Sequence, residues 1–317
     1  MLSRCILSVK TPVGPPIEII RHTFSAPLPK PAQRVSLVAG LHGDELEGLY
    51  ICHRLIETLK KLEEQDALKG EVHIYPAVNP QALETGTRLW PFFSVDINRT
   101  FGQTHTPSLP GETSKILLED LKSNSDLVVD IHSSNLHLME LPQIRIIKNF
   151  EKKLVPLAKF CNVDLIWVHP HAEIFESTLG YNLNQAKIPT LVIETGICLR
   201  INKNYCEQIV LGILNLLRQT GTIDSSEPEE EIREPKMVQP EYVAMVQAGN
   251  AGLFIKQAEV GQMVTEGEKI GDLIDPVGGQ VLEEIRSPRS GLLFTLREHP
   301  LTSKGAPVAR IATEEPA

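Results

Sequence analysis

The sequence predicts an α/β protein in which a doubly wound, mostly parallel sheet is followed by a second, smaller all-β domain. Short apolar runs alternate with amphipathic helical patterns up to about residue 219, and this alternation is typical of a parallel sheet covered by helices. An acidic, proline-rich stretch follows, and beyond it only short apolar runs separated by glycines remain. We therefore expect an α/β domain (1–221), an exposed linker (222–240) and a small all-β domain (241–317).

The elements of the α/β domain are expected in a regular order along the chain. Residues 4–22 predict one or two edge strands, because prolines interrupt them. Buried strands are then expected at 35–39, 72–78, 127–131, 144–147, 165–168 and 190–193. Helices are expected at 46–64, from 110 onward, at 150–161 and at 204–219.

The small all-β domain consists of two related halves. The stretch Ala251–Phe254 is echoed by Ser290–Phe294, and Val264–Gly267 is echoed by Leu301–Gly305. Two such halves resemble the barrel-sandwich hybrid of biotinyl and lipoyl carrier domains, although a plain small β-barrel is the alternative. The hairpin between them, residues 275–279, has no lysine to modify. We therefore expect a lid, docking or oligomerisation domain rather than a carrier.

The composition is that of an ordinary globular chain. Of the 317 residues, 42% are hydrophobic and 22% are charged. The net charge is −9 and no block of lysine and arginine occurs, which argues against a nucleic-acid partner. The five cysteines show no paired spacing, and no apolar run approaches the ~18 residues of a membrane span. We expect a cytoplasmic protein without a membrane partner, and a homo-oligomer is an open alternative.

Side chains able to bind a metal follow three of the predicted strands. His42 and Glu45 follow the first buried strand, His132 follows a second, and Glu194 follows a third. The carboxyl ends of parallel strands share one edge of a sheet, where open α/β sheets bind ligands. Alone, His42 and Glu45 would be better explained as a surface histidine and a glutamate at a helix N-terminus. Four such residues at a common edge favour a functional site.

This set predicts a catalytic zinc site. Zinc binds imidazole nitrogen and carboxylate oxygen at similar distances, roughly 2.0–2.2 Å. His42, Glu45 and His132 would supply three ligands and leave the fourth position open, which is typical of catalytic sites. A water there becomes a nucleophile, and Glu194 is the predicted base that takes its proton. The alternative for Glu194 is a carboxylate that caps the following loop.

Two further loops supply positive charge and another carboxylate. Arg99 beside Asn98 predicts a clamp for a substrate carboxylate. Arg88 is expected to stabilise an oxyanion beside the metal. Asp96 is placed to orient a ligand histidine through its second ring nitrogen. Without a metal site, solvated loop arginines would be the simpler interpretation.

These motifs together resemble those of the succinylglutamate desuccinylase/aspartoacylase family, a branch of the zinc carboxypeptidase-like hydrolases. Between residues 35 and 219 they read, in order, Gly-x-His-Gly-Asp-Glu, Asn-Pro, Arg, Asp-x-Asn-Arg-x-Phe, Asp-x-His and Glu-x-Gly. The resemblance implies a zinc carboxypeptidase-like fold and one zinc ion per chain, with His42, Glu45 and His132 as its ligands. The small C-terminal domain is similar to the one in bacterial predicted-deacylase members.

The resemblance also implies roles for the remaining site residues. Glu194 matches the catalytic glutamate, Arg88 the residue that polarises the scissile carbonyl, and Asn98 with Arg99 the clamp on the substrate carboxylate. The expected function is a zinc-dependent deacylase that hydrolyses the acyl-amide bond of an N-acyl amino acid or a related small carboxylate. Two alternatives are a zinc carboxypeptidase acting on peptide C-termini and a non-catalytic interaction module.

Other histidines near predicted strand ends are assigned no catalytic role. His169 and His171 follow a strand and are expected at most to line the pocket, as is Tyr181. His137 and Glu140 repeat the ligand spacing, but we expect them in a loop near the site because no partner from another strand end accompanies them. Neither a G-x-G-x-x-G nor a P-loop motif occurs, so dinucleotide and P-loop chemistry are excluded.

Overall fold

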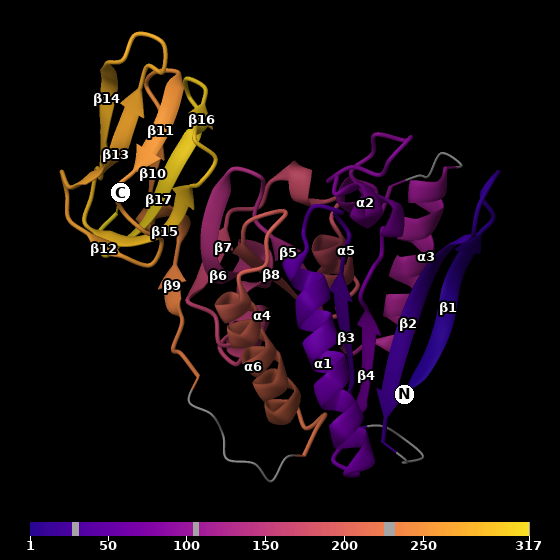
Figure 1. Cartoon of the computed structure of the whole chain (residues 1–317). Coiled ribbons are helices and arrows are strands. Elements are labelled where there is room, and N and C mark those ends of the chain that lie inside the picture. The colour runs from indigo at the N-terminus through magenta and orange to yellow at the C-terminus, as the bar shows by residue number, and fades with distance from the viewer. Residues whose placement is uncertain (27–31, 104–107, 225–231, 317) are drawn as a thin grey trace.

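The computed structural model describes residues 1–26, 32–103, 108–224 and 232–316, and Figure 1 shows its arrangement. The strands of the α/β part are β1 (Leu2–Val9), β2 (Ile17–Ser25), β3 (Arg34–Ala39), β4 (Glu71–Tyr75), β5 (Leu127–Ser133), β6 (Leu138–Ile147), β7 (Leu165–His169) and β8 (Thr190–Gly196). Its helices are α1 (Glu47–Glu64), α2 (Pro80–Thr85), α3 (Leu109–Asn124), α4 (Glu151–Ala158), α5 (Leu179–Gln185) and α6 (Lys203–Gln219).

The predicted α/β class with a mainly parallel central sheet is confirmed. Strands β4, β3, β5 and β8 lie side by side and parallel, and β6 and β7 are parallel to each other. Strand β6, however, runs antiparallel to β8. Only residues 134–137 join β5 to β6. A parallel neighbour would need a crossover connection of a dozen or more residues.

Helices cover both faces of this sheet. On one face α1, α4 and α6 bury apolar side chains such as Leu55, Leu154 and Ile213 against the strands. On the other face α3 and α5 do the same with Leu117 and Leu183. Figure 1 shows α1, α4 and α6 together on one side. Over the described residues, no helix is both long and apolar enough to cross a membrane.

A close backbone approach fixes the loop that follows β3. Gly43 lies so near α2 that a β-carbon on it would stand 1.9 Å from the carbonyl carbon of Ala82. Asn79 caps α2 by accepting a hydrogen bond from the amide of Ala82 at 3.2 Å. Because any other residue at position 43 would push the loop off α2, glycine sets the position of its neighbours His42 and Glu45.

The C-terminal module, defined here as residues 243–313, consists of short strands. They are β10 (Val243–Gln247), β11 (Gly252–Lys256), β12 (Met263–Val264), β13 (Lys269–Ile274), β14 (Val281–Arg286), β15 (Gly291–Arg297), β16 (Leu301–Thr302) and β17 (Pro307–Thr313). The two predicted halves exchange strands, since β16 pairs with β11 and β12 pairs with β15. Strands β14-β13-β11-β16 form a separate antiparallel sheet. The barrel-sandwich hybrid remains a prediction.

The module continues the large sheet of the α/β part. Strand β15 pairs antiparallel with the start of β6, so that Thr295 faces Glu140 and Arg297 faces Leu138. Strands β17 and β10 extend the same sheet beyond β15, as the orange and yellow strands of Figure 1 show. Side chains of β6 therefore stand directly beside those of the module.

The domain boundaries remain a prediction. Of the predicted linker (222–240), residues 225–231 lie outside the described residues. Strand β9 (Lys236–Val238), inside the same stretch, pairs parallel with β7.

Candidate metal centre

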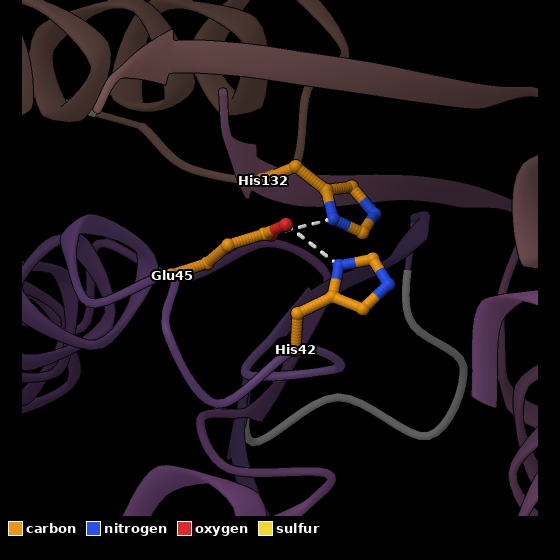
Figure 2. Close-up of side chains that lie close together, drawn as sticks. All are labelled: His42, Glu45 and His132. Atoms are coloured by element: carbon orange, nitrogen blue, oxygen red, sulfur yellow. Dashed lines mark hydrogen bonds and ion pairs between the residues drawn. The ribbon is translucent and has the colours of Figure 1, made fainter. Parts of the chain in front are cut away.

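Three buried side chains from two parts of the chain converge at one edge of the sheet. Figure 2 shows His42 and His132 with their rings turned toward the carboxylate of Glu45. The Nδ1 atom of His42 is 2.6 Å from Oε1 of Glu45, and Nδ1 of His132 is 2.8 Å from Oε2. One ligand atom from each residue lies within 4.8 Å of the others. The structure thus brings together the three residues predicted as ligands.

Neighbouring parallel strands explain this convergence. His42 lies in the loop after β3, and Glu45 lies just before α1. His132 is the penultimate residue of β5, whose Ile131 pairs with Ala39 at the end of β3. The sequence placed His132 beyond its strand, whereas β5 extends to Ser133 because its last residues pair with β8. The shared edge is nevertheless the predicted one.

A carboxylate faces the second nitrogen of each histidine. Asp96 places Oδ1 2.9 Å from Nε2 of His42, and Asp130 places Oδ2 3.1 Å from Nε2 of His132. Such carboxylates fix the tautomer and ring orientation, and they leave Nδ1 free to bind a metal. Asp96 stands where the sequence predicted. Asp130 was missed, although its position two residues before His132 puts both on one face of a strand.

The three ligand candidates shift one another's pKa values. Burial alone raises the pKa of Glu45, but the facing imidazoles of His42 and His132 outweigh it and bring that pKa below its ordinary value. Burial lowers the pKa of His42, but Glu45 and Asp96 reverse the effect and raise it. Two imidazole nitrogens and one carboxylate, all inaccessible to bulk water, are a donor set that suits a transition-metal ion.

Glu194 lies beside this group on β8. It is the register partner of His132 on β5 and lines the same cavity. Its Oε1 atom is 3.3 Å from Nη1 of Arg145. Burial raises the pKa of Glu194 to about 7, although Arg145 and His132 oppose the shift. A carboxyl group that titrates near neutral pH suits proton transfer in both directions.

Arg88 reaches the same centre from the loop after α2. Its Nη1 atom is 3.2 Å from Oε1 of Glu45, and its Nη2 atom is 3.1 Å from Oδ2 of Asp96. The Arg88 side chain is 38% exposed and lines the cavity. The guanidinium therefore lies both beside the centre and at the cavity wall.

Asn98 and Arg99 lie on a short 3-10 helix, η1 (Ile97–Arg99), and line the cavity. The carboxylate of Asp96 caps this helix by accepting a hydrogen bond from the amide of Asn98 at 2.9 Å. Oδ1 of Asn98 accepts a hydrogen bond from the backbone amide of Leu179 at 2.9 Å, which ties η1 to α5. Arg99 donates to the carbonyl oxygen of Asn98 at 2.8 Å.

One cavity of about 440 Å³ is bordered by the three ligand candidates and by Arg88, Asn98, Arg99, Asp130 and Glu194. The rest of its wall combines apolar and aromatic side chains, such as Phe150, Leu154, Phe175 and Tyr181, with polar and charged ones. His169 also lines it, whereas His171 pairs with Glu176 at 3.2 Å and is not among the described residues of its wall. A volume of this size fits a small molecule.

Residues 31–220 match the family model described as the succinylglutamate desuccinylase/aspartoacylase catalytic domain. The chain belongs to this family. The resemblance predicted from the sequence is confirmed, and so is the prediction of a hydrolase of the deacylase class.

Proteins with known names or structures resemble the chain over most of its length. An N-alpha-acetyl-L-2,4-diaminobutyric acid deacetylase from Halomonas elongata is 24% identical over 283 residues, which is 87% of this chain and 81% of the relative. The product-bound ectoine utilization protein from Ruegeria pomeroyi has a TM-score of 0.81 at 19% identity, covering 98% of this chain and 94% of that one. A succinylglutamate desuccinylase/aspartoacylase from Rhodobacter sphaeroides has a TM-score of 0.78 at 22% identity, covering 94% and 89%.

The sequence did not predict a buried cluster of charged side chains at the cavity wall. Glu140, expected in a loop, is a fully buried residue of β6. Its two oxygens each accept a hydrogen bond at 2.6 Å, one from Arg145 and one from Arg310 of the module. Burial and these two arginines lower the pKa of His169 to about 3. Arg145, a charged residue inside the apolar run at 144–147, was the one sign of this cluster in the sequence.

Proposed function

We propose that the chain is a zinc-dependent deacylase that hydrolyses the acyl-amide bond of an N-acyl amino acid or a related small carboxylate. The observation that carries this proposal is the convergence of His42, Glu45 and His132 beside Glu194, in one cavity of small-molecule size. The family named above supports it, because its named members are deacylases.

The residues present fit zinc. His42 and His132 would bind it through Nδ1 and Glu45 through a carboxylate oxygen, while the carboxylates of Asp96 and Asp130 face the opposite ring nitrogens. A bound zinc ion lowers the pKa of a water molecule to about 7 and polarises the carbonyl of the substrate.

Glu194 acts as the proton carrier of the reaction. In its carboxylate form it takes a proton from the attacking water, and it then returns that proton to the leaving amine. Its pKa of about 7 makes both steps feasible near neutral pH. Arg145, 3.3 Å away, orients the carboxylate toward the cavity.

The arginines of the cavity bind the negatively charged parts of the substrate. Arg88 donates to the carbonyl oxygen as charge develops on it during attack. Asn98 and Arg99, which line the same cavity, hold the carboxylate of the amino acid. The Halomonas elongata relative is named for removal of an acetyl group from an amino acid, which is consistent with a small N-acyl amino acid here.

Metal analysis and an activity assay test this proposal together. Zinc-loaded protein, incubated with a panel of N-acyl amino acids and short peptides, should contain about one zinc per chain and release free amino acid from the N-acyl compounds. Replacement of His42 or His132 by alanine should remove zinc and activity together. Faster cleavage of peptide C-termini would instead support a carboxypeptidase, and protein that binds no zinc would contradict the proposal.

Glu194→Gln separates catalysis from metal binding. The amide has the same shape but accepts no proton, so we expect full zinc content and a loss of kcat of about 100-fold or more. Inductively coupled plasma analysis and steady-state kinetics measure the two quantities. A Glu194→Gln variant with the kcat of the wild type would exclude Glu194 as the base.

A further inference from the structure

The C-terminal module contributes a side chain to the cavity wall. Arg310, on β17, borders the cavity together with Glu140, Arg145 and Glu194 of the α/β part. Strand β15, which separates β17 from β6 in the sheet, joins the module to the α/β part. The module is therefore placed to affect the reaction centre through a defined set of contacts.

Four charged groups alternate in sign from the module to Glu194. Arg310 donates to Oε1 of Glu140 at 2.6 Å, and Arg145 donates to Oε2 of the same carboxylate at 2.6 Å. Gln143 donates to Oε2 as well, at 2.7 Å. The other arm of the Arg145 guanidinium lies 3.3 Å from Oε1 of Glu194. Glu140 thus holds one arginine from each part of the protein.

An aromatic side chain packs against both arginines. The guanidinium carbons of Arg145 and Arg310 lie 5.6 Å and 5.4 Å from the ring centroid of Trp167 on β7. Both distances are within the range of cation–π attraction. His169 packs against the same indole, with ring centroids 4.0 Å apart. Each arginine therefore has a second contact besides the one with Glu140.

We infer that Arg310 is a positioning residue for the reaction: by occupying one oxygen of Glu140, it leaves Arg145 free to orient Glu194. A buried carboxylate needs its charge compensated. If Arg310 were absent, Arg145 would turn to bind both oxygens of Glu140 and would withdraw from Glu194. The expected change in kcat rests on the proposed function, since it requires Glu194 to be the base. The expected change in the contact between Arg145 and Glu194 does not.

Crystal structures and kinetics of Arg310→Met test the inference. We expect the variant to lose the contact between Arg145 and Glu194 that the wild type makes. A lost charge-assisted contact predicts a fall in kcat of about tenfold to 100-fold. The KM for an N-acyl amino acid and the zinc content should stay near the wild-type values. Arg310→Lys should restore part of the lost kcat, since a lysine can still bind Glu140.

A double-mutant cycle distinguishes positioning from a general structural role. In a Glu140→Gln background, Arg310→Met should change kcat by less than about threefold, because the link is already broken. Arg286→Met, which removes an exposed arginine of β14 from the same module, is the matched control and should keep wild-type kcat. Melting temperatures of all variants show whether the fold is retained.

The outcomes separate this inference from the proposed function. A retained contact between Arg145 and Glu194 in Arg310→Met, or an equal loss of kcat in both backgrounds, would overturn the inference. If wild-type protein hydrolyses no N-acyl amino acid but Arg310→Met still loses the contact, the proposed function fails and the positioning link stands. If the wild type is active and the variant keeps both contact and kcat, only the inference fails.

Discussion

The chemistry of the centre depends on which nitrogen each histidine leaves free. Asp96 and Asp130 occupy the vicinity of Nε2 in His42 and His132, so that both Nδ1 atoms point at Glu45. Neither aspartate is a ligand candidate, yet each determines what its histidine can bind. Substitutions of the aspartates should therefore change metal affinity without removing a ligand.

Asp130→Asn should weaken zinc binding. The amide keeps the size of the side chain but removes the charge facing His132, so the zinc dissociation constant should rise about 10-fold to 100-fold. Competition with a chelating dye measures it. Asp126→Asn, at an exposed aspartate paired with Arg34, is the matched control. Wild-type zinc affinity in Asp130→Asn would mean that Asp130 does not tune His132.

Arg99→Ala should raise KM selectively. Loss of a charged hydrogen bond to a carboxylate costs about 1.5–3 kcal/mol, so KM for N-acyl amino acids should rise about tenfold or more. The KM for the corresponding neutral amides should change little. The control is Arg200→Ala, an exposed arginine that donates to the carbonyl oxygen of Leu199. Equal effects of Arg99→Ala on both substrate classes would contradict the clamp.

At the scale of strands and helices, local patterns predicted most of the fold around the centre. The apolar runs that end near His42, His132 and Glu194 indicated three parallel strands, because each run is short and buried on both faces. The short helices α2 and α5 and the first residues of β6 were missed. Residues 138–143 alternate little and include Pro142, so their strand is set by pairing with β15 and β8 rather than by local preference.

A buried histidine of β4 makes the free energy of unfolding depend on pH. His73 is 2% exposed, and burial, with a further contribution from Arg21, lowers its pKa from 6.5 to about 4. Between pH 6.5 and 4, His73 is therefore mostly protonated in the unfolded chain and mostly neutral in the folded chain. The stabilisation is complete above pH 6.5 and is lost as the pH falls toward 4, by about 3 kcal/mol in all.

Replacing His73 should reduce that dependence. In His73→Gln, the free energy of unfolding from urea titrations should fall less steeply between pH 6.5 and 4 than in the wild type. His53→Gln, at an exposed histidine of α1, is the control and should follow the wild type. Identical slopes for His73→Gln and the wild type would show that His73 does not titrate as described.

On the scale of the whole molecule, the sheet unites regions that the sequence suggests are separate. The acidic stretch and the change of pattern at residue 241 predict an independent domain, and nothing local indicates that Arg310 reaches Glu140, 170 positions earlier. Contacts of this range depend on how β15 and β17 continue the large sheet. Hence the convergence of the three candidate ligands was predictable from strand ends, whereas the charge cluster beside Glu194 was not.

This continuity predicts a single unfolding transition. Strand β15 of the module pairs with β6 of the α/β part, and Arg310 of the module pairs with the buried Glu140 of the α/β part. Neither part therefore keeps all of its contacts without the other. Calorimetry should show one peak whose calorimetric and van't Hoff enthalpies agree. Two resolved peaks would mean that the module unfolds independently.

The pairing of β6 with β15 also bears on how the chain can be shortened. Ending it within the acidic stretch would uncover the amide and carbonyl groups of Leu138–Glu140 that now pair with β15. An open, partly apolar strand edge invites pairing with other molecules. Truncation there should yield aggregated protein rather than a smaller working enzyme.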